Sequence, residues 1–216
     1  MDVKAFLEIR TDFIGFYYSE AVKPFFQIQN AIENEKTPYD NPPYDESGEP
    51  PFQIEWFDAQ HGVEFVGLNC VSLLSDSLKL FFETLFTRVL GLKFNNAKNA
   101  FKGGFVRAYK NALSKHLTID WVREGVDFDL IEQVVLARNN AQHGEYLSDL
   151  SPYHNEKVLK KFPSPIFTDP NGLNNNGGSS RLFPLRVHVS KVSLTGAISE
   201  ITKMAEVIDK KVYSRG

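Results

Sequence analysis

The sequence is poor in cysteine, because Cys70 is the only one among 216 residues. A single cysteine cannot form a disulfide within the chain, and no CxxC pair is present to bind zinc. Cys70 lies in an apolar stretch, where we expect a small core residue. The histidines lack the spacing of metal ligands, so the sequence predicts neither a metal site nor a cofactor.

Long apolar runs are also missing. No stretch reaches about 18 uninterrupted apolar residues, so we expect no segment to span a membrane. The N-terminal residues contain no long apolar run after a basic start, so we expect no signal peptide. Together with the single cysteine, these absences favour a reducing compartment, and we expect a cytoplasmic protein.

An excess of positive charge is absent as well. The chain has 24 Lys and Arg against 27 Asp and Glu, a net charge of −3, and a pI near 6.0. This balance argues against a protein that holds nucleic acid by bulk charge, although it leaves room for a local basic groove. With 42% apolar residues and 18 Phe, residues 1–216 are expected to form one globular domain with an aromatic core.

Apolar residues at three- and four-residue spacing predict helices over most of the chain. In residues 2–19 the spacing is carried by Phe6, Ile9, Phe13 and Phe16 or Tyr17. Further helices are predicted over 24–35 after Pro24, and over 58–92, about 102–117, 127–149 and 191–213. We therefore expect an all-α fold, a bundle of four to five long helices.

The predicted helix 58–92 has two distinct faces, and Asp58 is placed to cap its start. A polar stripe contains Asn69, Ser72, Asp76, Glu83 and Thr87. The opposite side is apolar, with Val66, Cys70, Leu73, Leu74, Phe81, Leu85 and Val89. Ordinary surface is the expectation for Asp76 and Glu83, with a position facing a cleft as the alternative.

Two segments interrupt the helical pattern. Residues 36–57 begin with five prolines among Asp, Asn, Ser and Gly, which predicts a Pro-rich surface loop. Residues 150–190 are irregular and contain an Asn/Gly-rich turn. SPIFT before this turn and RLFPLRVHV after it predict a small β-hairpin inserted into the bundle, because apolar and polar residues alternate in the second arm.

A polar cluster occupies the predicted helix 127–149, where residues 136–147 read LARNNAQHGEYL. On a helix, Leu130, Val134, Ala137 and Ala141 form a narrow strip that we expect to face the core. Asn139 and His143 are four residues apart and share another face, while the long side chain of Arg138 can reach it from the edge of the strip. Leu136 and Leu147 border this cluster, as in a second contact surface such as a dimer interface.

These residue types suffice to cleave RNA without a metal. The imidazole of His143 titrates near neutral pH and can take a proton from a ribose 2′-OH. Arg138 can hold a phosphate by two contacts and stabilise the charge that gathers on it, while Asn139 orients either group. DNA lacks the hydroxyl and would not react in this way.

Arg138-Asn139-x-x-x-His143 resembles the Arg-x4-His signature of the HEPN domain family, in the form in which Asn follows Arg. A late helix in an all-α bundle agrees with that family. The resemblance implies a metal-independent endoribonuclease, with Arg138 and His143 as catalytic residues and Asn139 in support. It also implies a homodimer through the 127–149 helix, in which Leu136 and Leu147 belong to the seam. Toxins and antiviral defence proteins of prokaryotes are typical members.

Further residues are candidates for binding the RNA substrate, namely Gln142 and Tyr146 near the motif and Arg107 and Lys110 on the 102–117 helix. An antitoxin or another regulatory partner is an open alternative for control of the activity. In the toxin–antitoxin branch of HEPN proteins a Tyr often stands two residues after the His, where this chain has Glu145, so modification there is not expected. 

Two other functions remain open from the sequence alone. One is a catalytically silent HEPN-like bundle that binds a partner protein or a nucleotide, which the acidic balance favours. The other is an all-α interaction module unrelated to HEPN. The surface charge around His143 distinguishes the ribonuclease from the silent binder, because an RNA substrate needs a local basic groove. In the unrelated module His143 would point away from any cleft or symmetry axis.

Overall fold

The computed structural model describes residues 1–42, 46, 48–142, 152–169 and 185–213. Within these residues the regular secondary structure is helical, which confirms the predicted all-α class. The helices are α1 (Val3–Ala21), α2 (Lys23–Glu33), α3 (Gln53–Thr84), the π-helix η1 (Leu85–Val89), α4 (Ala97–Ala100), the 3-10 helix η2 (Phe101–Gly103), α5 (Phe105–Leu117), α6 (Phe128–Gln142), α7 (Glu156–Lys161) and α8 (Lys191–Tyr213).

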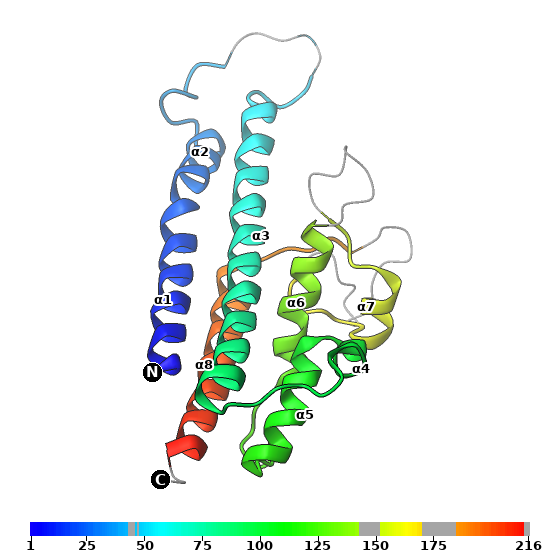
Figure 1. Cartoon of the computed structure of the whole chain (residues 1–216). Coiled ribbons are helices and arrows are strands. Elements are labelled where there is room, and N and C mark those ends of the chain that lie inside the picture. The colour runs from blue at the N-terminus through cyan, green and yellow to red at the C-terminus, as the bar shows by residue number, and fades with distance from the viewer. Residues whose placement is uncertain (43–45, 47, 143–151, 170–184, 214–216) are drawn as a thin grey trace.

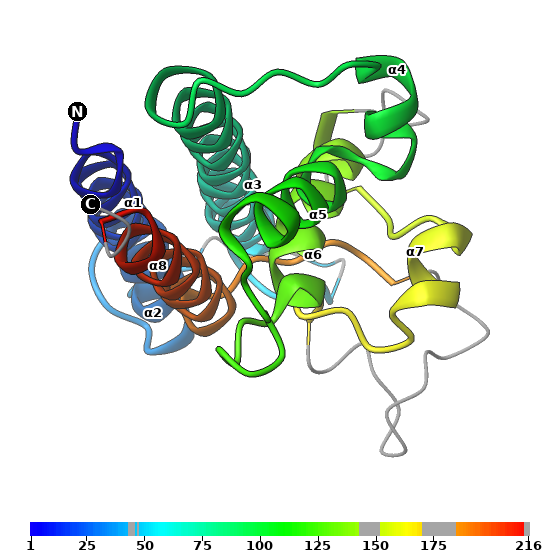
Figure 2. The ribbon, with the colours of Figure 1, turned by 60° about the horizontal axis from the view of Figure 1, so that its bottom comes forward.

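α3 is the central helix of the bundle (Figure 1). It runs antiparallel to α1 on one side, α6 lies along its other side, and α8 packs against both α1 and α3 (Figure 2). The side chains of Cys70, Leu74 and Leu78 on α3 are completely buried. Burial raises the pKa of the Cys70 thiol to about 12. Cys70 is therefore the core residue that the sequence predicts.

The central helix begins earlier than predicted. Gln53, rather than Asp58, starts α3, so residues 53–57 are helical and do not belong to the Pro-rich loop. The indole N–H of Trp56 donates to the Glu33 carboxylate at the end of α2, with 2.9 Å between the heavy atoms. This contact with another helix supports the additional turn at the start of α3. Capping signals in the local sequence do not reveal a contact between residues so far apart in the chain, so the sequence predicts a later start. The described residues before it, from 34 onward, form neither helix nor strand.

Gln53–Val89, which joins α3 and η1, is the one described segment long and apolar enough to cross a membrane. Its 37 residues reach a mean hydropathy of 1.4 over the most apolar window, and 56% of that window is buried inside the molecule. The core helix of a globular domain has the same properties, because it is apolar on several sides. The central place of α3 in the bundle accounts for its composition.

The buried face of α1 differs from the face that its aromatic residues mark in the sequence. Leu7, Thr11, Ile14 and Tyr18 are buried against the bundle. The residues whose spacing predicts the helix lie on its exposed face: Phe6, Ile9, Phe13 and Phe16. Both sets recur every three or four residues, so the period predicts the helix but not the face that packs. On α3, Leu73 likewise belongs to the predicted apolar side and is 41% exposed.

The predicted β-hairpin is not supported. The described parts of its two arms meet only in an isolated antiparallel bridge between Thr168 and Val187, and the turn lies outside the described residues. The backbone N–H of Val187 donates instead to the carbonyl of Pro152, at 2.7 Å. Val187 is completely buried, and Leu185 and Val189 are nearly so. The second arm is therefore an extended part of the core, and its alternation reflects burial rather than a strand ladder.

The other helix boundaries follow the prediction to different degrees. α8 spans the predicted range 191–213, and α2 starts with Pro24 in its first turn, as expected from the break there. α5 begins later than predicted, because Gly104, with a φ of 87°, separates it from η2. α7 has no counterpart among the predicted helices; the side chain of Asn155 caps it by accepting the backbone N–H of Val158 at 3.0 Å.

Gly67 lies where α3 approaches the extended residues that precede α8. A Cβ atom at Gly67 would come within 2.8 Å of the Val189 Cβ atom and 3.0 Å of its carbonyl oxygen. Val189 is held in place, because it is buried and its carbonyl accepts a hydrogen bond from the Tyr18 hydroxyl of α1 at 3.0 Å. The contact joins α1, α3 and the chain before α8 at one point.

We expect Gly67→Ala to lower the free energy of unfolding by about 1–3 kcal/mol, the usual cost of overpacking a filled core. Gly196→Ala is the matched control, because an added Cβ atom on that exposed part of α8 meets nothing within 4 Å. Alanine favours a helix over glycine by roughly 0.8–1 kcal/mol, so the control should equal or exceed the wild type in stability. Urea unfolding measures both, and equal midpoints for the two variants would contradict the close approach.

His154 is a buried histidine that holds the segment 152–169 together. Its Nε2 atom lies 2.9 Å from the Phe167 carbonyl oxygen and 3.0 Å from the Thr168 hydroxyl. The Nδ1 atom is buried and has no hydrogen-bond partner among the described residues. Burial lowers the pKa of His154 below its ordinary value of 6.5, although the bond to Phe167 opposes this shift. The ring is therefore held in the neutral form.

His188 is perturbed in the opposite direction. Its Nδ1 atom lies 3.4 Å from the Glu64 carboxylate on α3, and both side chains are mostly buried. The hydrogen bond to Glu64 raises the pKa of His188 above 6.5, against the effect of burial. The charged form of His188 is therefore favoured by the fold, whereas the charged form of His154 is disfavoured.

We expect these two histidines to give opposite pH dependences of stability. The contribution of His154 to the free energy of unfolding is present above its unfolded pKa of about 6.5. It is lost as the pH falls through its lower folded pKa. The contribution of His188 is present below about pH 6.5 and is lost as the pH rises through its higher folded pKa. The destabilisation by His154→Gln should thus be larger at about pH 7.5 than at about pH 5, and that by His188→Gln larger at the lower pH. Urea unfolding at both pH values checks this, and parallel profiles for the two variants would contradict it.

Candidate functional site

α6 carries the first part of the predicted motif and presents it at the edge of the bundle. It begins after Asp127, whose carboxylate accepts backbone N–H groups of the first turn. Val134 is completely buried and Ala137 is 1% exposed, which confirms the middle of the predicted strip, whereas Leu130 and Ala141 at its ends are only partly buried. The packing places Arg138 beside the strip, next to α3, and leaves Asn139 exposed.

The Arg138 guanidinium is partly buried and only loosely held. Its side chain is 29% exposed, and one terminal nitrogen donates to the Asn139 side-chain oxygen at 3.2 Å. The other terminal nitrogen lies 3.9 Å from a carboxylate oxygen of Asp76 on α3. The Nε atom is buried without a hydrogen-bond partner among the described residues. A closer anion would therefore form stronger contacts with Arg138 than Asp76 does.

A surface pocket of about 470 Å³ lies beside Arg138. α3 and α6 form two of its walls, and the aromatic residues of η2 and α5 form the third. The lining residues are Ser75, Asp76, Lys79, Glu83, Phe101, Gly104, Phe105, Tyr109, Val135, Arg138 and Asn139. This volume lies in the usual range for a small-molecule site, so the pocket has room for one nucleotide.

The pocket contains charges of both signs. Lys79 and Arg138 are positive, and each lies near a carboxylate, Glu83 at 3.8 Å and Asp76 at 3.9 Å respectively. Burial and the nearby Glu83 charge raise the pKa of Tyr109, so its hydroxyl is held in the neutral form. The described lining is therefore close to neutral, with two cations that an anionic ligand would have to draw from loose ion pairs.

The second asparagine of the motif turns away from the pocket. Asn140 is 9% exposed, and its side-chain oxygen accepts a hydrogen bond from the Asn155 side chain at 2.9 Å. Two turns earlier, the side-chain oxygen of Gln133 accepts the backbone N–H of Ile166 at 2.9 Å. These bonds attach the segment 152–169 to the outer side of α6. Asn140 thus has a structural place in the fold, whereas its neighbour Asn139 faces the pocket.

Arg107 and Lys110 are not among the residues that line this pocket. The Lys110 ammonium lies over the ring of Phe128, 4.7 Å from its centre, at the start of α6. Its backbone carbonyl accepts the indole N–H of Trp121 at 3.3 Å. Arg107 is exposed on α5. Neither side chain is brought to Arg138, and Lys110 contributes to packing between α5 and α6.

The remaining candidates lie outside the described residues. His143 and Tyr146 follow the described part of α6, and the side chain of Gln142, whose backbone ends that helix, is likewise not described. The structure thus brings Arg138 and Asn139 to the pocket. No group of three or more His, Cys, Asp or Glu residues in the described part of the chain is placed to hold a metal ion.

Lys79 is the charged lining residue that the sequence does not single out, whereas for Asp76 and Glu83 the position facing a cleft was the alternative to ordinary surface. The sequence places both acids in a polar stripe, for which ordinary surface is the expectation, yet both line the pocket. Asp76 and Glu83 share one face of the predicted helix, and this shared face is the feature of the sequence that indicates a common wall. Only the packing of α6 beside α3 distinguishes a pocket wall from open surface.

Comparison with protein-family models, with curated proteins and with solved structures finds no match to this chain. Helical bundles carry many unrelated functions, so the fold alone assigns no activity. The assignment of a function therefore depends on the chemistry of the pocket and on the resemblance of its motif to that of HEPN domains.

Proposed function

We propose that this chain is a HEPN-like, metal-independent endoribonuclease that cleaves RNA through its 2′-hydroxyl. The observation that carries this proposal is the Arg138 guanidinium, which borders a pocket large enough for a nucleotide and has only a loose contact with Asp76. Asn139 orients it, and His143 comes four residues after Asn139 in the sequence. Arginine is well suited to hold a phosphate, because its planar donors match two phosphate oxygens.

In the proposed reaction His143 acts as the general base. Its neutral imidazole takes the proton of the ribose 2′-OH, and the 2′-oxygen attacks the adjacent phosphorus. The bond from phosphorus to the 5′-oxygen of the next nucleotide breaks, and that oxygen leaves with a proton from a general acid or from water. The products are a 2′,3′-cyclic phosphate and a 5′-hydroxyl end. Arg138 stabilises the additional charge on the phosphate oxygens in the transition state.

The loose ion pair between Arg138 and Asp76 supports a site that is poised for an anion. At 3.9 Å the carboxylate shields Arg138 while the site is empty, and more than half of the Asp76 side chain is exposed. A doubly contacted phosphate is a stronger partner than this carboxylate. Binding of RNA would therefore transfer Arg138 from Asp76 to the phosphate, while Lys79 adds a second positive charge to the same pocket.

The aromatic wall supports a nucleobase next to the reacting phosphate. Phe101 and Phe105 are partly exposed and line the pocket with the buried Tyr109. Bases stack on such rings with little sequence preference. Gln142 and Tyr146 remain candidates for contacts with the substrate, in line with their positions after Asn139 in the chain.

The motif resemblance implies a homodimer formed through the 127–149 helix, and association of two copies, by whichever surface, is part of this proposal. A toxin or an antiviral defence component in the cytoplasm is the biological role that fits such an enzyme. An antitoxin or another regulatory partner would then restrain the cleavage.

The second candidate is a catalytically silent HEPN-like module that binds a nucleotide or a partner protein. The near-neutral lining favours it, because Asp76 and Glu83 offset the two cations of the pocket. RNA binding gains much of its affinity from positive charge. A module of this kind would bind a single nucleotide in the pocket and leave RNA intact.

We expect the purified wild type to cut total RNA in the presence of EDTA and to leave 2′,3′-cyclic phosphate ends. Arg138→Ala and His143→Ala should each lower the cleavage rate by about a hundredfold or more, the usual cost of losing a transition-state contact or a general base. Arg138→Lys should also be strongly impaired, because lysine keeps the charge but loses the two-point contact. Electrophoresis and analysis of the fragment ends measure the outcome.

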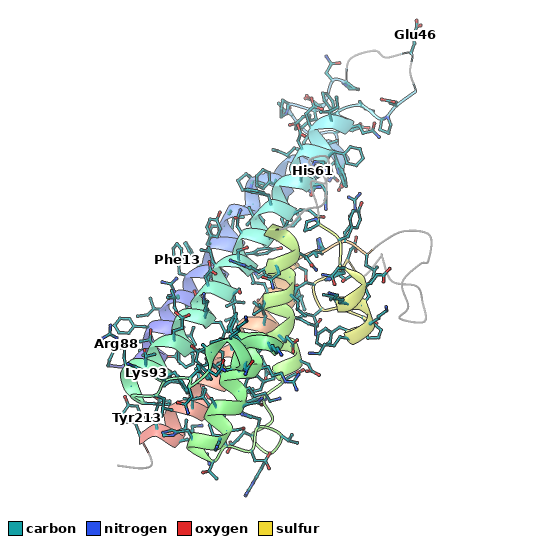
Figure 3. All side chains as sticks on the ribbon, turned by 45° about the vertical axis from the view of Figure 1, so that its right-hand side comes forward. Phe13, Glu46, His61, Arg88, Lys93 and Tyr213 are labelled. Atoms are coloured by element: carbon teal, nitrogen blue, oxygen red, sulfur yellow. The ribbon has the colours of Figure 1, made fainter. Side chains whose placement is uncertain are left out.

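Matched controls are available on α3 and η1. His61 lies near the upper end of α3 and Arg88 near the lower end of the long helix, both away from the pocket lining (Figure 3). His61→Ala and Arg88→Ala should cut RNA at the wild-type rate. Cleavage by Arg138→Ala and His143→Ala at the rate of these controls would refute the assignment. Binding of a nucleotide without cleavage by the wild type would favour the silent module.

A further inference from the structure

The outer face of α1 carries a row of apolar side chains that nothing in the described chain covers. Phe6, Ile9, Phe13 and Phe16 are 61%, 65%, 60% and 62% exposed. Figure 3 shows Phe13 on the outer side of α1, pointing away from the bundle. Single exposed apolar residues are normal, but four in a row on one helix are a contiguous patch.

The row continues onto α3. The two helices are antiparallel, and the Arg10 guanidinium donates to the Ser77 hydroxyl at 3.0 Å, which sets their relative level. Leu73 and Leu80 lie on either side of Ser77 along α3 and are 41% and 49% exposed. A groove of about 370 Å³ separates the helices, and Phe6, Ile9 and Leu80 are among its lining residues. We name these six residues, Phe6, Ile9, Phe13, Phe16, Leu73 and Leu80, the apolar strip.

The apolar strip is large for the surface of a monomer. With about 200 Å² for a whole aromatic side chain and somewhat less for isoleucine and leucine, the exposed fractions leave roughly 600 Å² of the six side chains in water. The largest patch on a typical monomer is about 300–600 Å² and is often functional. Two such strips in contact would bury roughly 1,200 Å², the lower end of specific interfaces before any polar rim is added.

We propose that the apolar strip is the surface through which two copies of this chain form a twofold dimer. The spacing of the four α1 residues is three, four and three, the pattern of the core positions of a coiled coil. This spacing reads the same in both directions, so the row matches a second copy of itself. A twofold interface requires such self-complementarity, because the same patch serves on both subunits.

The polar residues of α1 favour a protein, rather than a membrane surface, as the partner of the apolar strip. Arg10 and Asp12, of opposite charge, lie on either side of the row, and the ion pair of Lys4 with Glu8, at 2.9 Å, lies further round the helix toward α8. A helix that lies on anionic lipid has a polar face rich in Lys and Arg. Mixed signs beside an aromatic row are instead typical of the rim of a protein interface.

The proposed interface takes the place of the contact through the 127–149 helix that the motif resemblance implies, because the described part of α6 has no exposed large apolar residue. It nevertheless lies next to the candidate site. Leu73 and Leu80 flank Asp76 by three and four residues on α3, so the edge of the apolar strip is also the edge of the pocket. The dimer itself depends on apolar area and not on RNA cleavage, so either proposal can fail while the other stands.

The first test is the mass of the protein in solution, measured by sedimentation velocity over a range of concentrations. We expect the wild type to be a dimer, and Phe13→Glu and Leu73→Glu to shift it to a monomer by placing a charge in the interface. Val122→Glu and Val192→Glu are the matched controls, because these residues are 91% and 82% exposed outside the apolar strip. The controls should remain dimeric. All these positions are at the surface, and circular dichroism should confirm unchanged helix content.

The second test gives a positive signal. Cys70 is completely buried, so a cysteine introduced on the surface is the accessible thiol for a short bis-maleimide. Asp12→Cys, beside the middle of the row, should be cross-linked to a dimer, and Val192→Cys should not. A monomeric wild type, or a dimer that survives both glutamates in the apolar strip, would overturn the proposal. Binding of the wild type to anionic vesicles that the two glutamate variants abolish would do so as well, in favour of a membrane surface.

Discussion

Other helices pack against α3 on only part of its circumference. This partial packing is the constraint on which the apolar strip and the pocket both depend. Cys70, Leu74 and Leu78 are completely buried where α1 and α8 cover the helix. Complete burial of a leucine contributes about 1.5–3 kcal/mol each, so these positions fix the rotation of α3. With the rotation fixed, Leu73, Asp76 and Leu80 must face outward. One face of one helix thereby supplies both the edge of the apolar strip and a wall of the pocket.

The sequence predicts the helices well because each buries a face with a period near 3.6 residues. The range 191–213 and the core positions Val134 and Ala137 follow directly from that period. The same signal fails on α1, where the rows of Leu7 with Ile14 and of Phe6 with Phe13 are equally periodic. Hydrophobicity alone even favours the aromatic row as the core. Only the shape of the bundle decides which row is buried.

Other differences arise from contacts between distant parts of the chain. The first turn of α3 depends on the bond from Trp56 to Glu33 across the loop, and no local cap announces it. Val187 alternates with its neighbours because it is buried among helices, so its pattern imitates a strand. The motif itself is visible in the sequence, but the pairing of Arg138 with Asp76 is not, since 62 positions separate them along the chain. Local patterns reveal elements, whereas sites require their packing.

The shared face of α3 gives the two proposals a physical connection. A second copy on the apolar strip would exclude water beside Leu73 and Leu80, close to the Asp76 carboxylate. Charges interact more strongly as the local dielectric falls, so the attraction between Asp76 and Arg138 would increase. A phosphate would experience the same increase, and a phosphate with two contacts gains more than a carboxylate at 3.9 Å. Association of two copies would therefore sharpen the preference of Arg138 for phosphate, even though neither copy contributes a residue from the apolar strip to the pocket of the other.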